Sequence, residues 1–155
     1  MNTSLNAKQS LGKSTELLIT SLLLDEGREV WLPTVDDHGV DLIIKTREFN
    51  NEVGGTKAQH HEYQEVQIKS VSGTREALFV FDLKQAKPNY WFIFYVKNIN
   101  TFWLINSMDI AEPGAFPQNK TGKNVGKYNI SLTTQNLNIS KKYKKYIVDD
   151  FYKIP

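Results

Sequence analysis

The 155-residue chain contains no cysteine, which excludes disulfides and thiolate metal sites such as zinc fingers. Of its three histidines, His60 and His61 lack helix or strand spacing to a third ligand, so we do not interpret them as a zinc site. No apolar run approaches the roughly 18 residues that a membrane-spanning helix needs. The polar N-terminus also lacks the apolar core of a signal peptide. A cytoplasmic protein with no membrane role is the simplest interpretation.

The composition is that of an ordinary globular protein, with 40% hydrophobic and 23% charged residues. The length suits one domain over residues 1–155, and no repeat or linker divides it. A net charge of +2 permits binding to a polyanion but does not argue strongly for it. Length, composition and net charge therefore do not indicate a function, which has to be inferred from particular residues.

Hydrophobic periodicity predicts a helix over residues 13–27, with Leu17, Leu18, Leu22 and Leu24 near helical spacing. Short strands are expected at 29–33, 40–46 and 63–71, and a loop at 47–61. The aromatic run at 90–96 predicts a strand buried on both faces, paired with 101–106, and a last helix is expected over 139–154. The order indicates an α/β fold with a central mixed β-sheet flanked by helices.

The strand EVQIKS (65–70) has an unusual polar face. Val66 and Ile68 alternate with Glu65, Gln67 and Lys69, so a carboxylate, an amide and an ammonium point the same way. If strands 40–46 and 63–71 are antiparallel, one register places Asp41 directly across from Gln67. An aspartate, a second oxygen ligand and a lysine would then converge.

This set of residues has a chemical use. Mg²⁺ prefers oxygen ligands and keeps several waters, so one or two side chains can hold it. Asp41 would be the charged ligand, the Gln67 amide oxygen a second, and the Ile68 carbonyl a third. A metal ion held there could polarise a phosphate oxygen and lower the pKa of a bound water. Lys69 could stabilise charge that builds on the phosphate.

The order of these residues resembles the PD-(D/E)XK nuclease superfamily, in particular archaeal-type Holliday junction resolvases and Mrr-like restriction endonucleases. Those families have a helix with a glutamate, a strand, Gly-x-Asp at the head of the next strand, and then a (D/E/Q)-x-K strand. Here Glu16, the strand at 29–33, the Gly39–Asp41 tripeptide and the Gln67–Lys69 tripeptide follow in that order. The resemblance covers roughly residues 12–71. It implies a restriction-endonuclease-like core, DNA as substrate, and Mg²⁺ or Mn²⁺ as cofactor.

Gln67 departs from the acidic residue that many members carry, although Mrr-like members also have Gln there. The change removes one negative charge from the metal site. Glu65 could supply a second carboxylate, although a solvated or salt-bridged role is the alternative. Glu16 is the other candidate, if the start of the first helix packs beside the site.

Two lysine-rich segments are candidates for DNA backbone contacts. One is the loop 119–127, with Lys120 and Lys123. The other is KKYKKY, with Lys141, Lys142, Lys144 and Lys145. A solvated surface is the alternative for the second segment.

We therefore expect a metal-dependent DNA endonuclease that hydrolyses phosphodiester bonds in restriction, recombination or repair, working as a homodimer or with a partner protein. The alternative is a nuclease-like module without catalysis that binds DNA or another protein. A third possibility is an α/β domain with no role in nucleic-acid metabolism.

Overall fold

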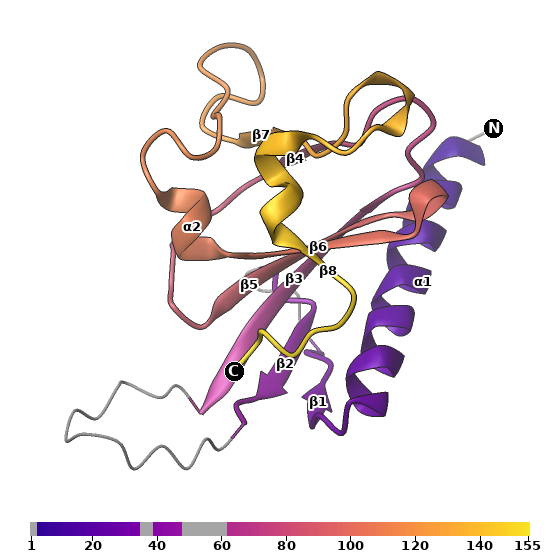
Figure 1. The fold of residues 1–155 in the computed structure, drawn as a ribbon, viewed down its shortest axis with the longest axis vertical. Coiled ribbons are helices and arrows are strands. Elements are labelled where there is room, and N and C mark those ends of the chain that lie inside the picture. Colours follow the sequence, from indigo (N-terminus) through magenta and orange to yellow (C-terminus); the bar gives the residue numbers. More distant parts are fainter. Residues whose placement is uncertain (1–2, 35–38, 48–61) are drawn as a thin grey trace.

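The computed structural model describes residues 3–34, 39–47 and 62–155, and its centre is a mixed six-stranded sheet (Figure 1). The strand order is β1-β2-β3-β5-β6-β8, in which β3 and β5 are parallel and all other neighbours are antiparallel. A separate two-stranded sheet joins β4 and β7. Within the described ranges, no helix is both long and apolar enough to cross a membrane.

The elements have the following bounds: α1 Thr3–Asp25, β1 Val30–Trp31, β2 Leu42–Lys45, β3 Tyr63–Val71, β4 Leu78–Phe81, β5 Tyr90–Val96, β6 Thr101–Asn106, α2 Ser107–Ala111, β7 Tyr128–Ser131 and β8 Ile147–Val148. Short 3-10 helices η1, η2 and η3 span Lys97–Ile99, Gln135–Leu137 and Lys141–Tyr146. The predicted fold class, a central mixed sheet flanked by helices, is confirmed, and β2 and β3 are antiparallel, as the register considered for Asp41 and Gln67 requires.

Helix α1 covers one face of the sheet (Figure 1). It begins at Thr3, well before the predicted start, because residues 7–9 are good helix formers and no proline interrupts them. Ile19 and Leu23 are fully buried against the sheet, whereas Leu17 and Leu24 are more than half exposed. The leucine spacing therefore predicted the helix correctly, although Leu17, Leu18 and Leu24 are exposed and Leu22 alone of the four packs against the core.

The opposite face of the sheet packs on the β4–β7 layer through aromatic side chains. Phe92 and Phe94 of β5 point into this core, where the ring centroid of Phe81 of β4 lies 4.9 Å and 5.3 Å from theirs. Ile93, between them, belongs to the core on the α1 side. The prediction that the aromatic run is a strand buried on both faces is confirmed.

The predicted C-terminal helix over residues 139–154 is wrong. The chain forms only the short η3 and then continues as β8, which pairs with β6 through Val148 and Phe102. Tyr143 is buried and stacks on Phe116 at 5.3 Å, so η3 is held by this contact. The β-branched pair Ile147–Val148 suits a strand better than a helix.

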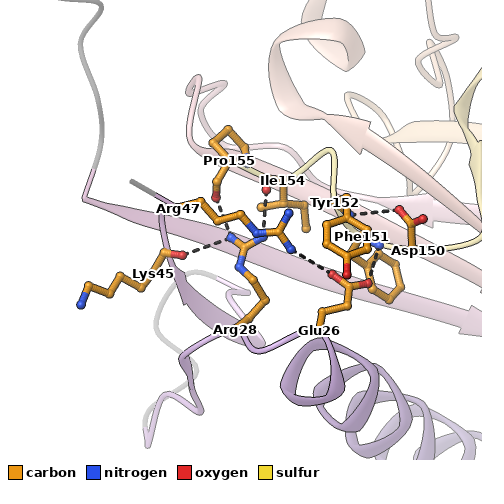
Figure 2. Close-up of polar contacts among 9 residues, drawn as sticks. All are labelled: Glu26, Arg28, Lys45, Arg47, Asp150, Phe151, Tyr152, Ile154 and Pro155. Atoms are coloured by element: carbon orange, nitrogen blue, oxygen red, sulfur yellow. Dashed lines mark hydrogen bonds and ion pairs between the residues drawn. The ribbon is translucent and has the colours of Figure 1, made fainter. Parts of the chain in front are cut away.

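The last residues return to the junction of α1 and β1, where Arg28 binds them (Figure 2). The guanidinium of Arg28 is almost fully buried and donates to the carbonyls of Lys45, Ile154 and Pro155 at 3.1, 2.9 and 2.6 Å. The Glu26 carboxylate accepts the Phe151 N–H at 2.8 Å. We call these contacts the C-terminal clamp.

Replacing Arg28 should destabilise the protein substantially. In Arg28→Met the three carbonyls lose a buried charged donor, so we expect the free energy of unfolding to fall by about 2–4 kcal/mol in urea titration. Arg47→Met is the matched control, because Arg47 is partly exposed, pairs with Glu26 at 3.4 Å and lies over the Tyr152 ring. Its loss should cost less than about 1 kcal/mol. Equal losses in the two variants would contradict a special role for the clamp.

Candidate functional site

A cleft of about 660 Å³ opens between β3 of the large sheet and the end of β4. Glu65, Gln67 and Lys69 line it together, as expected from their shared face of β3. Its charged residues are Glu65, Lys69, Asp82, Lys84, Lys87 and Lys127, which are four lysines and two carboxylates. The cleft is therefore lined by a positive excess of two charges, which favours an anionic ligand.

Asp41 holds strand β3 at two points on either side of Gln67. Its backbone N–H donates to the Val66 carbonyl at 2.8 Å, and its carboxylate Oδ2 accepts the Ile68 N–H at 2.6 Å. The ladder pairs Leu42 with Val66. This is the same register that would pair Asp41 with Gln67, because partners move in opposite directions along antiparallel strands. Asp41 is thus placed beside the backbone of Gln67, although the ladder does not pair these two residues directly.

The geometry at Asp41 nevertheless differs from a continuous strand. Val66 meets both Asp41, through a hydrogen bond, and Leu42, through the ladder, as in a β-bulge. Val40 consequently packs against the aromatic core, whereas Leu42 and Ile44 belong to the core on the α1 side. The bulge re-aims the Asp41 side chain toward the edge of β3, where it bonds the Ile68 N–H. In an extended strand the Ile68 carbonyl points to the same edge as its N–H.

Gln67 is almost buried, and two residues fix its amide. The Tyr90 hydroxyl donates to Gln67 Oε1 at 3.2 Å, and Tyr90 itself is 7% exposed. On the other side Gly39 has a left-handed backbone with φ of +73°. A Cβ on Gly39 would lie 2.4 Å from Gln67 Nε2, so the amide occupies the space that a side chain there would need.

Gly39→Ala should therefore displace Gln67. The positive φ costs about 1 kcal/mol of stability, and the new methyl group pushes the Gln67 amide away because the amide is the movable partner. Gly122→Ala is the matched control, since Gly122 has φ of +78° and a Cβ added there would meet nothing within 4 Å. We expect similar stability losses in urea titration, but a shift of the Gln67 side-chain amide signals in NMR spectra only for Gly39→Ala. Unchanged Gln67 signals would contradict this packing.

Glu65 is paired with Lys87, which agrees with the salt-bridged alternative for this residue. Lys87 Nζ lies 2.8 Å and 3.1 Å from the two carboxylate oxygens of Glu65. The side chains of Lys87 and Glu65 are about one-third exposed, at 37% and 28%. Glu65 thus lines the cleft as one member of an ion pair.

Glu16, the other candidate for a second carboxylate, is paired on its own helix with Lys13 at 2.8 Å. The hydrogen bond to Glu16 raises the pKa of Lys13, and the Asp41 carboxylate adds a weaker effect in the same direction. This turn of α1 therefore lies within electrostatic reach of Asp41, and neither Glu16 nor Asp41 is among the residues that line the cleft.

Apart from Lys127, the lysines of the two lysine-rich segments do not line the cleft. Lys141, Lys142, Lys144 and Lys145 are exposed on η3, with the Lys145 ammonium 4.8 Å from the Tyr146 ring. Lys120 and Lys123 are exposed on a loop that backbone hydrogen bonds close between Asn119 and Lys127. Only the last lysine of this loop, Lys127, reaches the cleft, where it lies 3.6 Å from Asp82.

Among the cleft residues that sequence reasoning did not single out are Lys84, Lys87 and Tyr90, whereas Lys127 belongs to the loop 119–127 that was expected to contact DNA. Tyr90 is, in the sequence, simply the first residue of a core strand, and its hydroxyl is informative only once β5 is known to lie parallel to β3. The cluster of Lys84 and Lys87 just before β5 was the available signal. The three histidines fall outside the described residues.

The donors around Asp41 fit a hard divalent cation better than zinc. Among the residues that the structure describes, no three His, Asp or Glu side chains gather into a metal-binding group. The available donors are carboxylate, amide and carbonyl oxygens of Asp41, Gln67 and Ile68. Mg²⁺ and Mn²⁺ take such oxygen donors and complete their shell with water.

Neither a family model nor a curated protein sequence matches this chain. Among solved structures, the chain is similar to the bacterial homing endonuclease I-Ssp6803I, with a TM-score of 0.54 and 14% identity. The match covers 95% of this chain and 88% of the other. At this identity the likeness concerns the fold, and the chain has an endonuclease-like fold.

Proposed function

We propose that this protein is a metal-dependent DNA endonuclease of the PD-(D/E)XK type that hydrolyses phosphodiester bonds at the cleft. The observation that carries the proposal is the arrangement at β3, where Asp41 bonds on both sides of Gln67 while Gln67 and Lys69 line one cleft. The shared fold with a homing endonuclease supports DNA as the substrate.

In this proposal Asp41, Gln67 and the Ile68 carbonyl hold Mg²⁺ or Mn²⁺. An ion held there would supply Lewis-acid chemistry, that is, it would polarise a phosphate oxygen and lower the pKa of a water molecule. Lys69 donates to the phosphate oxygens on which negative charge builds during the reaction. Lys84 and Lys127, at the other side of the cleft, bind the neighbouring phosphates by charge.

One observation favours the alternative of a DNA-binding module without catalysis. Each side chain proposed as a ligand already has a protein partner: Asp41 bonds the Ile68 N–H, and Gln67 bonds the Tyr90 hydroxyl. Because these hydrogen bonds already satisfy the proposed ligands, the fold does not need a metal ion at this site. The positive cleft would then bind the DNA backbone alone.

A cleavage assay separates the two functions. The purified protein is incubated with supercoiled plasmid, linear duplex and branched DNA, each with Mg²⁺, Mn²⁺ or EDTA. The endonuclease proposal predicts nicked or shortened DNA with either metal and none with EDTA. A shift in gel mobility without cleavage would favour the DNA-binding module over the enzyme. If the protein neither cleaves nor shifts DNA, then DNA is not its ligand.

A further inference from the structure

Lys87 differs from an ordinary surface lysine because its backbone is fixed on both sides. Its N–H donates to the hydroxyl of Ser107 at 2.9 Å, and the same hydroxyl donates back to the Lys87 carbonyl at 2.7 Å. Ser107 is fully buried at the start of α2. The Tyr90 N–H also donates to the Lys87 carbonyl, at 3.1 Å.

The residues that follow Lys87 are tied to the neighbouring strands. The Asn89 carbonyl accepts the N–H of Glu65 at 2.7 Å, and the Pro88 carbonyl accepts from the Asn106 side chain at 2.8 Å. The segment 87–89 therefore has a set position relative to Glu65. Exposed ion pairs contribute little to stability partly because two long side chains lose entropy when they are held in one geometry. Here the backbone of Lys87 is already fixed, so only the side chains have to be ordered.

The Glu65 carboxylate cannot bind an ammonium on both oxygens and coordinate a metal ion at full strength at the same time. An ammonium at the carboxylate also repels a divalent cation nearby, since like charges a few ångströms apart interact unfavourably even near water. The Glu65–Lys87 ion pair therefore lowers the affinity of the cleft for a divalent cation.

We propose that Lys87 is a built-in counter-ion that occupies Glu65 until a divalent cation binds in the cleft, and that it leaves Glu65 when the cation arrives. This inference rests on the proposed metal site at Asp41 and Gln67. It makes Glu65 the second carboxylate of that site and Lys87 the residue that sets the metal affinity. Lys87 is a positioning residue, because it acts through Glu65.

The test is a Mn²⁺ titration of the whole protein without DNA, followed by the electron paramagnetic resonance signal of free Mn²⁺. Lys87→Met should bind Mn²⁺ about five- to tenfold more tightly than the wild type, because a competitor and a repelling charge are both removed. Adding Glu65→Gln to Lys87→Met should abolish this gain. Lys87→Arg keeps the pairing charge and should bind like the wild type.

Lys84→Met is the matched control, because Lys84 lines the same cleft and the described contacts include no carboxylate at its ammonium. It should tighten binding by no more than about twofold, through the loss of charge alone. Equal gains for Lys84→Met and Lys87→Met, or no gain for Lys87→Met, would overturn the role of Lys87 while leaving a site that Asp41→Asn removes. Absence of Mn²⁺ binding in every protein would overturn both this inference and the proposed metal site.

Discussion

The Lys69→Met variant is expected to cleave DNA about 10²–10³-fold more slowly than the wild type while binding DNA almost as tightly. Lys69 lines the cleft beside Gln67, where it would meet the phosphate as negative charge develops. A group that acts mainly in the transition state affects the rate more than ground-state binding. Single-turnover cleavage at saturating protein, together with binding titrations, measures the two effects separately.

The contrast is a variant in which the four lysines of η3 are changed to alanine: Lys141, Lys142, Lys144 and Lys145. These exposed side chains do not line the cleft, so we expect them to meet phosphates other than the one that is cleaved. Their removal should weaken binding at all sequences and flatten its salt dependence, by a slope of about 0.9 for each phosphate that the variant no longer neutralises. Once saturated, this variant should still cleave. Wild-type cleavage by Lys69→Met would make the binding module the better explanation.

Asp41→Asn is expected to abolish saturable Mn²⁺ binding and metal-dependent cleavage. The amide oxygen of Asn can still accept the Ile68 N–H, whose bond to Asp41 is 2.6 Å, but the charged ligand next to Gln67 is lost. Asp41→Ala removes the charge and the hydrogen bond together, so it tests a different property. Mn²⁺ titration measures the first effect, and urea titration measures the stability of both variants.

The two variants separate a metal ligand from a residue that only holds the strand. If Asp41 is a ligand, Asn and Ala should be equally poor at binding Mn²⁺, while Ala should be less stable by about 1–3 kcal/mol because the Ile68 N–H loses its acceptor. If Asp41→Asn binds Mn²⁺ like the wild type, then Asp41 is a structural residue and the metal must be sought elsewhere.

Local pattern was enough to predict β3 over residues 63–71, because strict alternation of apolar and polar residues specifies a strand and its two faces. The register of β2 on β3 followed, since only one register buries Leu42 opposite Val66, and it brings Asp41 close to the backbone of Gln67. The predicted placement of these two residues therefore depended on period-two geometry, which the sequence displays directly.

Contacts between distant segments could not be predicted in the same way. Lys87 reaches Glu65 from a backbone position that is bonded to Ser107, which lies on another element. The β-bulge at Asp41 depends on where the chain leaves Gly39, whose positive φ no pattern of hydrophobicity reveals. Helical propensity suggested a helix at the C-terminal end, and pairing of Val148 with Phe102 overrode it.

The C-terminal clamp bears on folding during synthesis, because it joins residues that are made early to residues that are made last. Arg28 leaves the ribosomal tunnel long before Ile154 and Pro155 are made, yet its buried guanidinium binds their carbonyls in the folded molecule. Until then Arg28 and Glu26 lack these late partners, and the edge of β6 that takes β8 is uncovered. The clamp and the pairing of β8 with β6 can therefore form only after residues 147–155 have left the tunnel, so these contacts are completed late in synthesis.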